Sequence, residues 1–304
     1  MTTPFRLFSL PFIPLKQVLD HFGPDGIIIL SLCSQRSKSI AVSYSGPSKN
    51  VQLQLKYCNR IGALAYGSTD ILNVIDNMDI ELPTLSNGYF QHVRFIMHDD
   101  CLVLFCDDII TGLIEIGNHA REVFNRDIYE VTILGKAGDN YKPLIEWTVE
   151  TQNTVDNFQY IEHEKTRDED LDYILENVKC DYLSLSAIPS ENYRPAKPLV
   201  CRLHHINISD SFWIKPEDLL GMNCQIIKIE DSKLTSQDFN MFMKHWMTGA
   251  WSHLSLLEID VEEDINYETV FDGVEFIERG EDVERVLKIE YSKRETTLFC
   301  RVHN

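Results

Sequence analysis

The stretch Leu10-Pro11-Phe12-Ile13-Pro14-Leu15-Lys16-Gln17-Val18-Leu19 decides the N-terminal fold of this 304-residue chain. Proline restricts its own backbone and that of the residue before it, so Leu10-Pro11 predicts an extended entry. Pro14 suits a first helical position, where its missing N–H costs nothing. Leu15, Val18 and Leu19 then follow at helical spacing on one face. The stretch therefore predicts a short helix that begins at Pro14.

Two further short segments follow the first helix. Gly23-Pro24 ends that helix and begins a second one, in which residues 27–32 are apolar on most sides. Cys33 to Lys38 is polar and basic and leads into a third segment. Short helices of this kind cannot bury such an apolar surface within forty residues. They require a partner or the rest of the chain.

These residues resemble an F-box of the large nematode families. The matching features are Leu10-Pro11, the apolar positions from Leu15 to Leu19, those from Ile27 to Leu32, and Cys33. The resemblance implies that residues 1–42 form a three-helix F-box, which docks on a Skp-family adaptor and through it on a cullin–RING ubiquitin ligase. The residues at the family's apolar docking positions are Leu10, Pro11, Leu15, Val18, Leu19, Leu30 and Cys33. The alternative is an ordinary helical cap on an α/β domain.

Composition limits the class of protein. A hydrophobic content of 44% and a charged content of 25% are ordinary for a globular protein, and no apolar run reaches membrane-spanning length. The formal net charge of −19 argues against nucleic acid as a partner, because phosphate binding needs clustered Lys and Arg. Residues 258–284 carry twelve acidic residues against one basic residue, Arg279. The first residues do not resemble a signal peptide, so we expect an intracellular protein, cytoplasmic or nuclear, with reduced and buried cysteines.

The region from residue 43 to residue 110 is expected to be a β-rich connection packed on the next domain. Residues 51–55, 93–96 and 102–105 have the alternation or the apolar runs of strands, and 39–42 shows a similar pattern. Turn residues occur at 45–48 and 86–89. No catalytic motif falls here.

A short apolar pair recurs along residues 111–304. It is Val131 and Ile133, then Phe158 and Tyr160, Leu183 and Leu185, Ile206 and Ile208, Ile227 and Ile229, and Leu257 and Ile259. The spacings of 27, 25, 23, 21 and 30 residues are typical of leucine-rich-type repeats, in which each strand is followed by a helix or an irregular return. Apolar stripes predict helices near 113–124, 171–178 and 239–246, the last preceded by the capping box Thr235-Ser236-Gln237-Asp238. Residues 144–147 resemble an extra strand.

This second region resembles the F-box-associated domain, type 2, of the same nematode families. The matching residues are 211–214 (Ser-Phe-Trp-Ile), 217–220 (Glu-Asp-Leu-Leu), 234–238 (Leu-Thr-Ser-Gln-Asp), 244–246 (Lys-His-Trp) and 256–259 (Leu-Leu-Glu-Ile). The resemblance implies a domain that recognises substrates. The expected fold class is α/β, with an N-terminal three-helix F-box followed by an irregular, leucine-rich-repeat-like α/β solenoid.

The histidines and carboxylates are the candidate residues for an enzyme site. His98-Asp99-Asp100 and Asp107-Asp108 lack the spacing of a metal loop, and paired Asp residues at strand ends usually form turns. His204 and His205 would point to opposite faces of a strand, and His245 and His253 have no partner ligand at a useful spacing. No hydrolase elbow, phosphate loop or zinc motif is present. We predict no catalytic residue, metal or cofactor.

A polar row is predicted beside the apolar pairs. Period-two geometry turns Thr132, Gln159, Ser184, Asn207, Lys228 and Glu258 away from the core. In a solenoid this strand face commonly binds partners, although a merely solvated sheet face is equally consistent with the pattern. The residues predicted to bind a target are Asn207, Lys228, Glu230, Trp251, Glu258 and Asp260.

Together these patterns favour a non-catalytic, substrate-recognition subunit of a Skp–cullin–F-box ubiquitin ligase. It would bind the adaptor through the F-box and a target protein, one with a basic patch, through the C-terminal domain. A repeat-type interaction scaffold without a ubiquitin-ligase link is the alternative.

Overall fold

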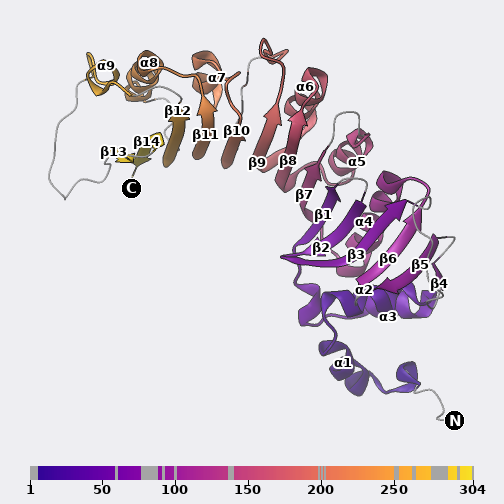
Figure 1. The fold of residues 1–304 in the computed structure, drawn as a ribbon. Coiled ribbons are helices and arrows are strands. Elements are labelled where there is room, and N and C mark those ends of the chain that lie inside the picture. The colour runs from indigo at the N-terminus through magenta and orange to yellow at the C-terminus, as the bar shows by residue number, and fades with distance from the viewer. Residues whose placement is uncertain are drawn as a thin grey trace. The chain divides into compact units, whose positions relative to one another are not determined.

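The computed structural model describes residues 6–58, 61–76, 88–90, 93–98, 101–135, 140–197, 199, 201, 203–249, 253–261, 265–274, 287–292 and 295–302. Its internal packing divides the chain into two compact units, Met1–Leu134 with Asn140–Val155, and Gly135–Asp139 with Asp156–Asn304. Both units mix helices with strands (Figure 1). Within the described ranges, every helix is too short or too polar to cross a lipid bilayer.

Three short helices open the first unit, as predicted. They are α1 (Phe12–Asp20), α2 (Pro24–Leu32) and α3 (Gln35–Ser43), with 3-10 turns at Leu7–Ser9 and Pro47–Lys49. Pro24 occupies the first turn of α2, directly after Gly23, which matches the predicted break. However, α1 begins at Phe12 rather than at Pro14. The apolar middle helix α2 buries Ile27, Ile28 and Leu32 inside the unit.

The strand expected at residues 39–42 is wrong, because these residues lie inside α3. The side chain of Ser34 caps this helix by accepting a hydrogen bond from the backbone N–H of Ser37 at 3.1 Å. Ala41 and Ser37 are fully buried on the inner side of the helix. Capping and tertiary packing therefore outweigh the weak strand preference of Ile40 and Val42.

A mixed sheet forms the body of the first unit. Its strands are β1 (Leu53–Cys58), β2 (Ile61–Tyr66), β3 (Thr69–Asp76), β4 (Gly88–Phe90), β5 (Val93–His98), β6 (Cys101–Cys106) and β7 (Ile128–Leu134), in the order β7-β1-β2-β3-β6-β5-β4. Helix α4 (Ile109–Phe124) packs closely on one face of this sheet. A Cβ atom on Gly62 of β2 would lie 2.5 Å from Cγ of Leu113, so the close approach of helix and sheet requires glycine.

The extra strand expected at residues 144–147 is also wrong, because this segment belongs to helix α5 (Lys142–Gln152). Leu144, Ile145 and Thr148 are buried at helical spacing, and Pro143 occupies the first turn. A four-residue segment with three apolar side chains is compatible with either structure, and only the spacing to Thr148 distinguishes them.

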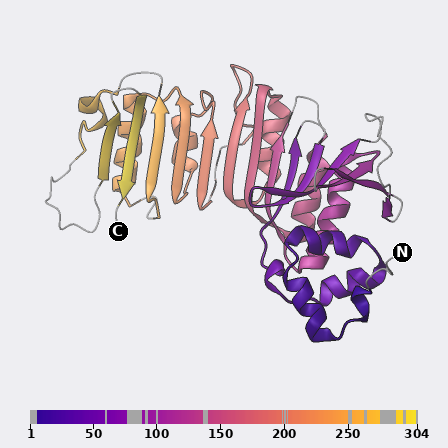
Figure 2. The same ribbon diagram turned by 60° about the horizontal axis from the view of Figure 1, so that its bottom comes forward.

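The second unit repeats strands and helices. Its elements are β8 (Val155–Lys165), α6 (Asp168–Asn177), β9 (Cys180–Ile188), β10 (His205–Ser209), α7 (Pro216–Gly221), β11 (Ile226–Ser232), α8 (Ser236–Met247), β12 (Leu256–Val261), α9 (Tyr267–Val270), β13 (Leu287–Ser292) and β14 (Glu295–Val302). The strand order is β8-β9-β10-β11-β12-β14-β13, and β9 to β12 are parallel neighbours. Helices α6, α7 and α8 lie on one side of these strands (Figure 2).

The predicted inward pairs are confirmed. Leu183, Ile206, Ile227 and Leu257 are in register across β9 to β12, and so are Leu185, Ile208, Ile229 and Ile259. All of these side chains are buried. The capping box of α8 is also confirmed, with reciprocal hydrogen bonds between Thr235 and Asp238. The leucine-rich-repeat-like solenoid and the division at residues 42 and 110 stay predictions.

Candidate functional site

The first candidate surface is the start of α1. Phe12 and Ile13 are 77% and 69% exposed, the largest exposures among the large apolar side chains that the structure describes. Pro11 and Pro14 beside them are exposed as well. Exposed apolar residues that lie side by side are typical of a surface that binds a protein.

The structure places the predicted adaptor-binding residues in three environments. Pro11 and Cys33 are exposed, and Leu10, Leu15, Val18 and Leu30 are half-buried. Leu19 is only 2% exposed and contributes to the core of the three-helix region. The sequence prediction did not include Phe12 and Ile13, although their position inside the Leu-Pro stretch was a usable signal.

The outer surface of α1 is bordered by a fixed pair of charges. Lys16 donates hydrogen bonds to Asp20 one turn later, with a shortest distance of 2.9 Å, and the Tyr44 hydroxyl donates to Asp20 at 2.8 Å. The bonds from Lys16 and then Tyr44 hold the pKa of the Asp20 carboxyl below its usual value. Asp20 therefore stays ionised and keeps the end of α1 attached to the turn after α3.

Polar contacts attach α2 and α3 to α4. Ser31 of α2 donates to the carbonyl of Ile28 at 2.6 Å, and its oxygen lies 2.7 Å from Nε2 of His119 on α4. The hydroxyl proton of Ser31 is directed to Ile28, so Nε2–H of a neutral His119 donates to Ser31. Burial, followed by the nearby charge of Lys38, lowers the pKa of His119 to about 4, while Glu122 acts in the opposite direction.

Two lysines strengthen the same attachment. Lys38 of α3 forms an ion pair with Glu122 of α4 at 2.6 Å. The ammonium of Lys49 donates to the carbonyl of Val42 at 3.1 Å and also to that of Val123, so one cation caps the C-terminal ends of α3 and α4 together. A positive charge at a helix C-terminus is favourable. The three-helix region is therefore bonded directly to the helix that covers the sheet.

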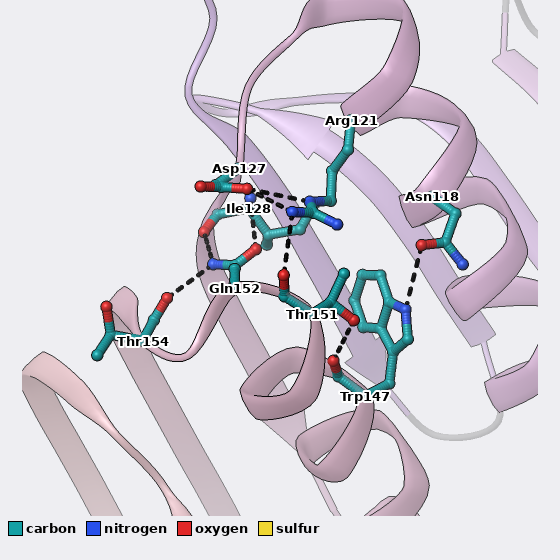
Figure 3. A network of polar contacts seen from close by, with 8 residues as sticks. All are labelled: Asn118, Arg121, Asp127, Ile128, Trp147, Thr151, Gln152 and Thr154. Carbon is teal, nitrogen blue, oxygen red and sulfur yellow. Dashed lines mark hydrogen bonds and ion pairs between the residues drawn. The ribbon is translucent and has the colours of Figure 1, made fainter.

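A polar network joins the end of α4 to β7 and α5 (Figure 3). The Gln152 amide accepts from the N–H of Ile128 at 2.9 Å and donates to the carbonyl of the same residue at 2.7 Å. Arg121 forms an ion pair with Asp127 at 2.5 Å, and the Trp147 indole donates to Asn118 at 3.2 Å. A shallow hollow beside the network is lined by Asn118, Arg121, Glu122, Asn125, Arg126 and Asp127. The polar groups of this network bond to one another and hold α4, β7 and α5 together, so the network has a structural role.

The second candidate surface is the strand face of the second unit, opposite α6 to α8. Ser184, Asn207, Lys228 and Glu258 are in register on β9 to β12 and are half-buried rather than buried in the core. Lys228 and Glu258 form an ion pair at 2.9 Å. The predicted polar row is therefore present at these four positions, and we call it the middle row.

Carboxylates collect at the next outward positions. Ser186, Ser209, Glu230 and Asp260 form this upper row, in which the Ser209 hydroxyl donates to Glu230 at 2.8 Å. Asp210 directly follows β10, and Asp231 interrupts the pairing of β11. Both have a left-handed backbone, with φ 55° at Asp210 and φ 56° at Asp231. Burial, then the charges of Asp231 and Glu230, raise the pKa of Asp210, although His163 and Ser186 oppose the shift.

Other predicted positions differ from expectation or lie elsewhere. Thr132 is buried, at 8% exposure, and belongs to the first unit, so it is not part of an outward row. Trp251 and most acidic residues of 262–284 lie outside the described residues. Trp246, the last residue of the apolar stripe of α8, is half-buried rather than buried in the core. Cys33 and Cys58 are exposed, so the expectation that the cysteines are buried is wrong for these two.

Residues of the histidine and carboxylate motifs make structural contacts. Asp108 is the N-cap of α4 and accepts from the N–H of Thr111 at 3.0 Å. His205 faces outward on β10, where its ring lies 4.3 Å from that of Tyr182 in an edge-to-face arrangement. In the part of the chain that the structure describes, no group of three or more His, Cys, Asp or Glu residues could hold a metal ion.

Comparison with known proteins identifies one part of the second unit. Residues 195–259, which contain β10, α7, β11, α8 and the first four of the six residues of β12, match the family model described as F-box associated. This segment is similar to F-box-associated proteins. It confirms the resemblance based on residues 211–214, 217–220 and 234–238.

A second comparison gives a shorter similarity. The chain is 34% identical over 71 residues to the E3 ubiquitin-protein ligase hecw-1 of Caenorhabditis elegans. That alignment covers 23% of this chain and 6% of the relative, so the chain spans only a small part of that protein's length. No solved structure matches the chain significantly.

Proposed function

We propose that this protein is the substrate-recognition subunit of a Skp–cullin–F-box ubiquitin ligase. Residues 1–42 act as the F-box and bind a Skp-family adaptor, which connects to a cullin–RING ligase. The domain from residue 111 onward binds a target protein. In this proposal the protein itself performs no chemistry. Its role is to raise the effective concentration of the target near the ligase. Such a subunit works in the cytoplasm or the nucleus.

One observation carries the proposal. A three-helix region with two strongly exposed apolar side chains, Phe12 and Ile13, precedes an F-box-associated region in the same chain. Apolar side chains of this size are favourable in the centre of an interface and unfavourable in water. The match of residues 195–259 links the chain to F-box proteins, and the exposed start of α1 provides a surface for an adaptor.

The test is co-purification of the full chain with a Skp-family adaptor. We expect Phe12→Asp combined with Ile13→Asp to weaken adaptor binding about a hundredfold or more, because each aspartate would lose its hydration at the interface. The melting temperature should change little, since both side chains point into solvent. A matched control is Met241→Asp combined with Met247→Asp, which changes exposed apolar residues of α8.

Two outcomes would contradict the proposal. Full co-elution of the α1 variant would show that this surface does not bind the adaptor. Absence of a complex with the unaltered chain would favour the alternative, a scaffold without a ligase link. Leu19→Asp provides a reference for unfolding, because Leu19 is buried in the core.

A further inference from the structure

The strand face of the second unit has a third row that the sequence interpretation missed. Tyr182, His205, Ile226 and Leu256 are in register across β9 to β12, two residues before the middle row. All four are half-buried on the outward side of their strands. Burial, then the charge of Lys228, lowers the pKa of His205, so its ring is neutral at neutral pH. This lower row is therefore uncharged, and it consists of two aliphatic side chains, Ile226 and Leu256, and two rings, those of Tyr182 and His205.

The three rows form a gradient across one face. The lower row is uncharged and half aliphatic, and the middle row contains the ion pair of Lys228 with Glu258 and is otherwise neutral. The upper row and its adjoining turns carry four carboxylates, those of Glu230, Asp260, Asp210 and Asp231. Four residues along a strand separate the lower row from the upper one, a distance of about 13 Å. The face thus has an uncharged edge with aliphatic and ring side chains, and an acidic edge.

We infer that this face binds an amphipathic, basic helix of a target protein, laid across β9 to β12. An α-helix with its side chains is about 10–12 Å wide, close to the separation of the two outer rows. Its apolar stripe would contact the lower row, and lysine or arginine side chains on the adjoining stripe would reach the carboxylates of the upper row. This inference rests on the proposed function and specifies the target surface and the kind of segment it takes.

Charge decides against other occupants. A second copy of this chain, with its net charge of −19, would bring like charges to the acidic edge. Nucleic acid and anionic lipid headgroups would meet the same repulsion. An acidic edge alone would favour any cation, but the uncharged row beside it, with Ile226 and Leu256, favours a partner that carries apolar as well as basic side chains.

The experiment uses fluorescently labelled synthetic peptides and the full chain. One peptide of leucine, lysine and alanine has its leucines at i, i+3, i+4 and i+7, with lysines on the adjoining helical stripe. A second peptide has the same composition arranged with alternating leucine and lysine. We expect the helical peptide to bind at least about tenfold more tightly in anisotropy measurements, and its affinity to fall as salt increases.

Variants of each outer row test the docking geometry. Ile226→Thr with Leu256→Thr keeps strand-forming residues and removes apolar contacts, and we expect at least about fivefold weaker binding of the helical peptide. Glu230→Lys with Asp260→Lys should weaken it more and reduce its salt dependence. The matched control, Glu115→Lys with Glu150→Lys, makes the same change of charge at exposed positions of α4 and α5.

The outcomes separate this inference from the proposed function. Equal binding of the two peptides, or an equal effect of the upper-row and control variants, would overturn it, because the peptide would then respond only to net charge. Each variant is also tested for adaptor co-elution and for its melting temperature. Loss of peptide binding with adaptor binding intact supports the inference, and normal peptide binding by a chain that fails to bind the adaptor would overturn only the proposed function.

Discussion

Acidification should destabilise the first unit through His119. In the unfolded chain this histidine has an ordinary pKa of 6.5, whereas in the folded unit its pKa is about 4, chiefly because it is buried. The unfolded state therefore binds more protons between these two values, and stability falls as the pH decreases through that window. Lys38 increases the effect and Glu122 reduces it. From these pKa values, the change from pH 7 to pH 5 removes about 2 kcal/mol.

His119→Gln isolates this contribution. A glutamine amide can still donate to Ser31 but cannot take up a proton. Between pH 7 and pH 5, the unfolding free energy of the variant should therefore decrease by about 2 kcal/mol less than that of the original chain. The assay is urea unfolding at both pH values, followed by far-UV circular dichroism. The transition of the first unit must be fitted separately, because a chain of two units need not unfold in one step.

Both the sign and the size of the difference in unfolding free energy between the original chain and His119→Gln test the reasoning. If both proteins lose the same free energy on acidification, His119 is already charged or solvated in the folded unit, and the reasoning from burial is refuted. A smaller loss in the original chain than in the variant would reverse the sign and refute it too. Carboxylates that titrate in this range are common to both proteins and cancel in the difference.

Three further changes should lower stability, each measured by denaturant unfolding. Gly62→Ala should destabilise the first unit by about 1–3 kcal/mol because its Cβ would meet Leu113, and a shift in the transition of the second unit instead would contradict this. Gln152→Leu removes the side-chain amide that bonds to both the N–H and the carbonyl of Ile128, so the unfolding free energy should decrease by about 1–3 kcal/mol. Thr154→Ala keeps the backbone carbonyl of residue 154 that accepts from Gln152, so this control should change the unfolding free energy little. Thr235→Ala removes the cap of α8 and should lose about 1 kcal/mol, while Thr235→Ser should retain most of it.

The sequence predicted those elements whose pattern is long and regular. The paired apolar positions of β9 to β12 repeat with period two, and the stripe of α8 begins at a capping box, so both were found. Residues 39–42 and 144–147 were misassigned because four residues are too few to separate period two from helical spacing. Their helical state depends on contacts with distant residues, such as the attachment of α3 to α4 through Lys38 and Glu122.

The sequence also predicted only part of the candidate surfaces, because burial and strand register depend on distant contacts. Family positions pointed to the start of the chain as an adaptor-binding surface, which stays a prediction, and only the folded structure shows that Leu19 is core and that Phe12 and Ile13 are exposed. On the strand face, alternation predicted which side each residue takes. It could not show that Tyr182, His205, Ile226 and Leu256 align, because alignment depends on the register between strands.

The shared cap at Lys49 bears on how this chain could be recombined with others. Because one ammonium serves the ends of both α3 and α4, and Ser31 relies on His119, the first helices do not form an exchangeable cassette. A chimera that takes residues 1–43 from another chain would place foreign side chains against His119 and Glu122 on α4. Such a graft should succeed only when the facing residues of α4 are transplanted with it.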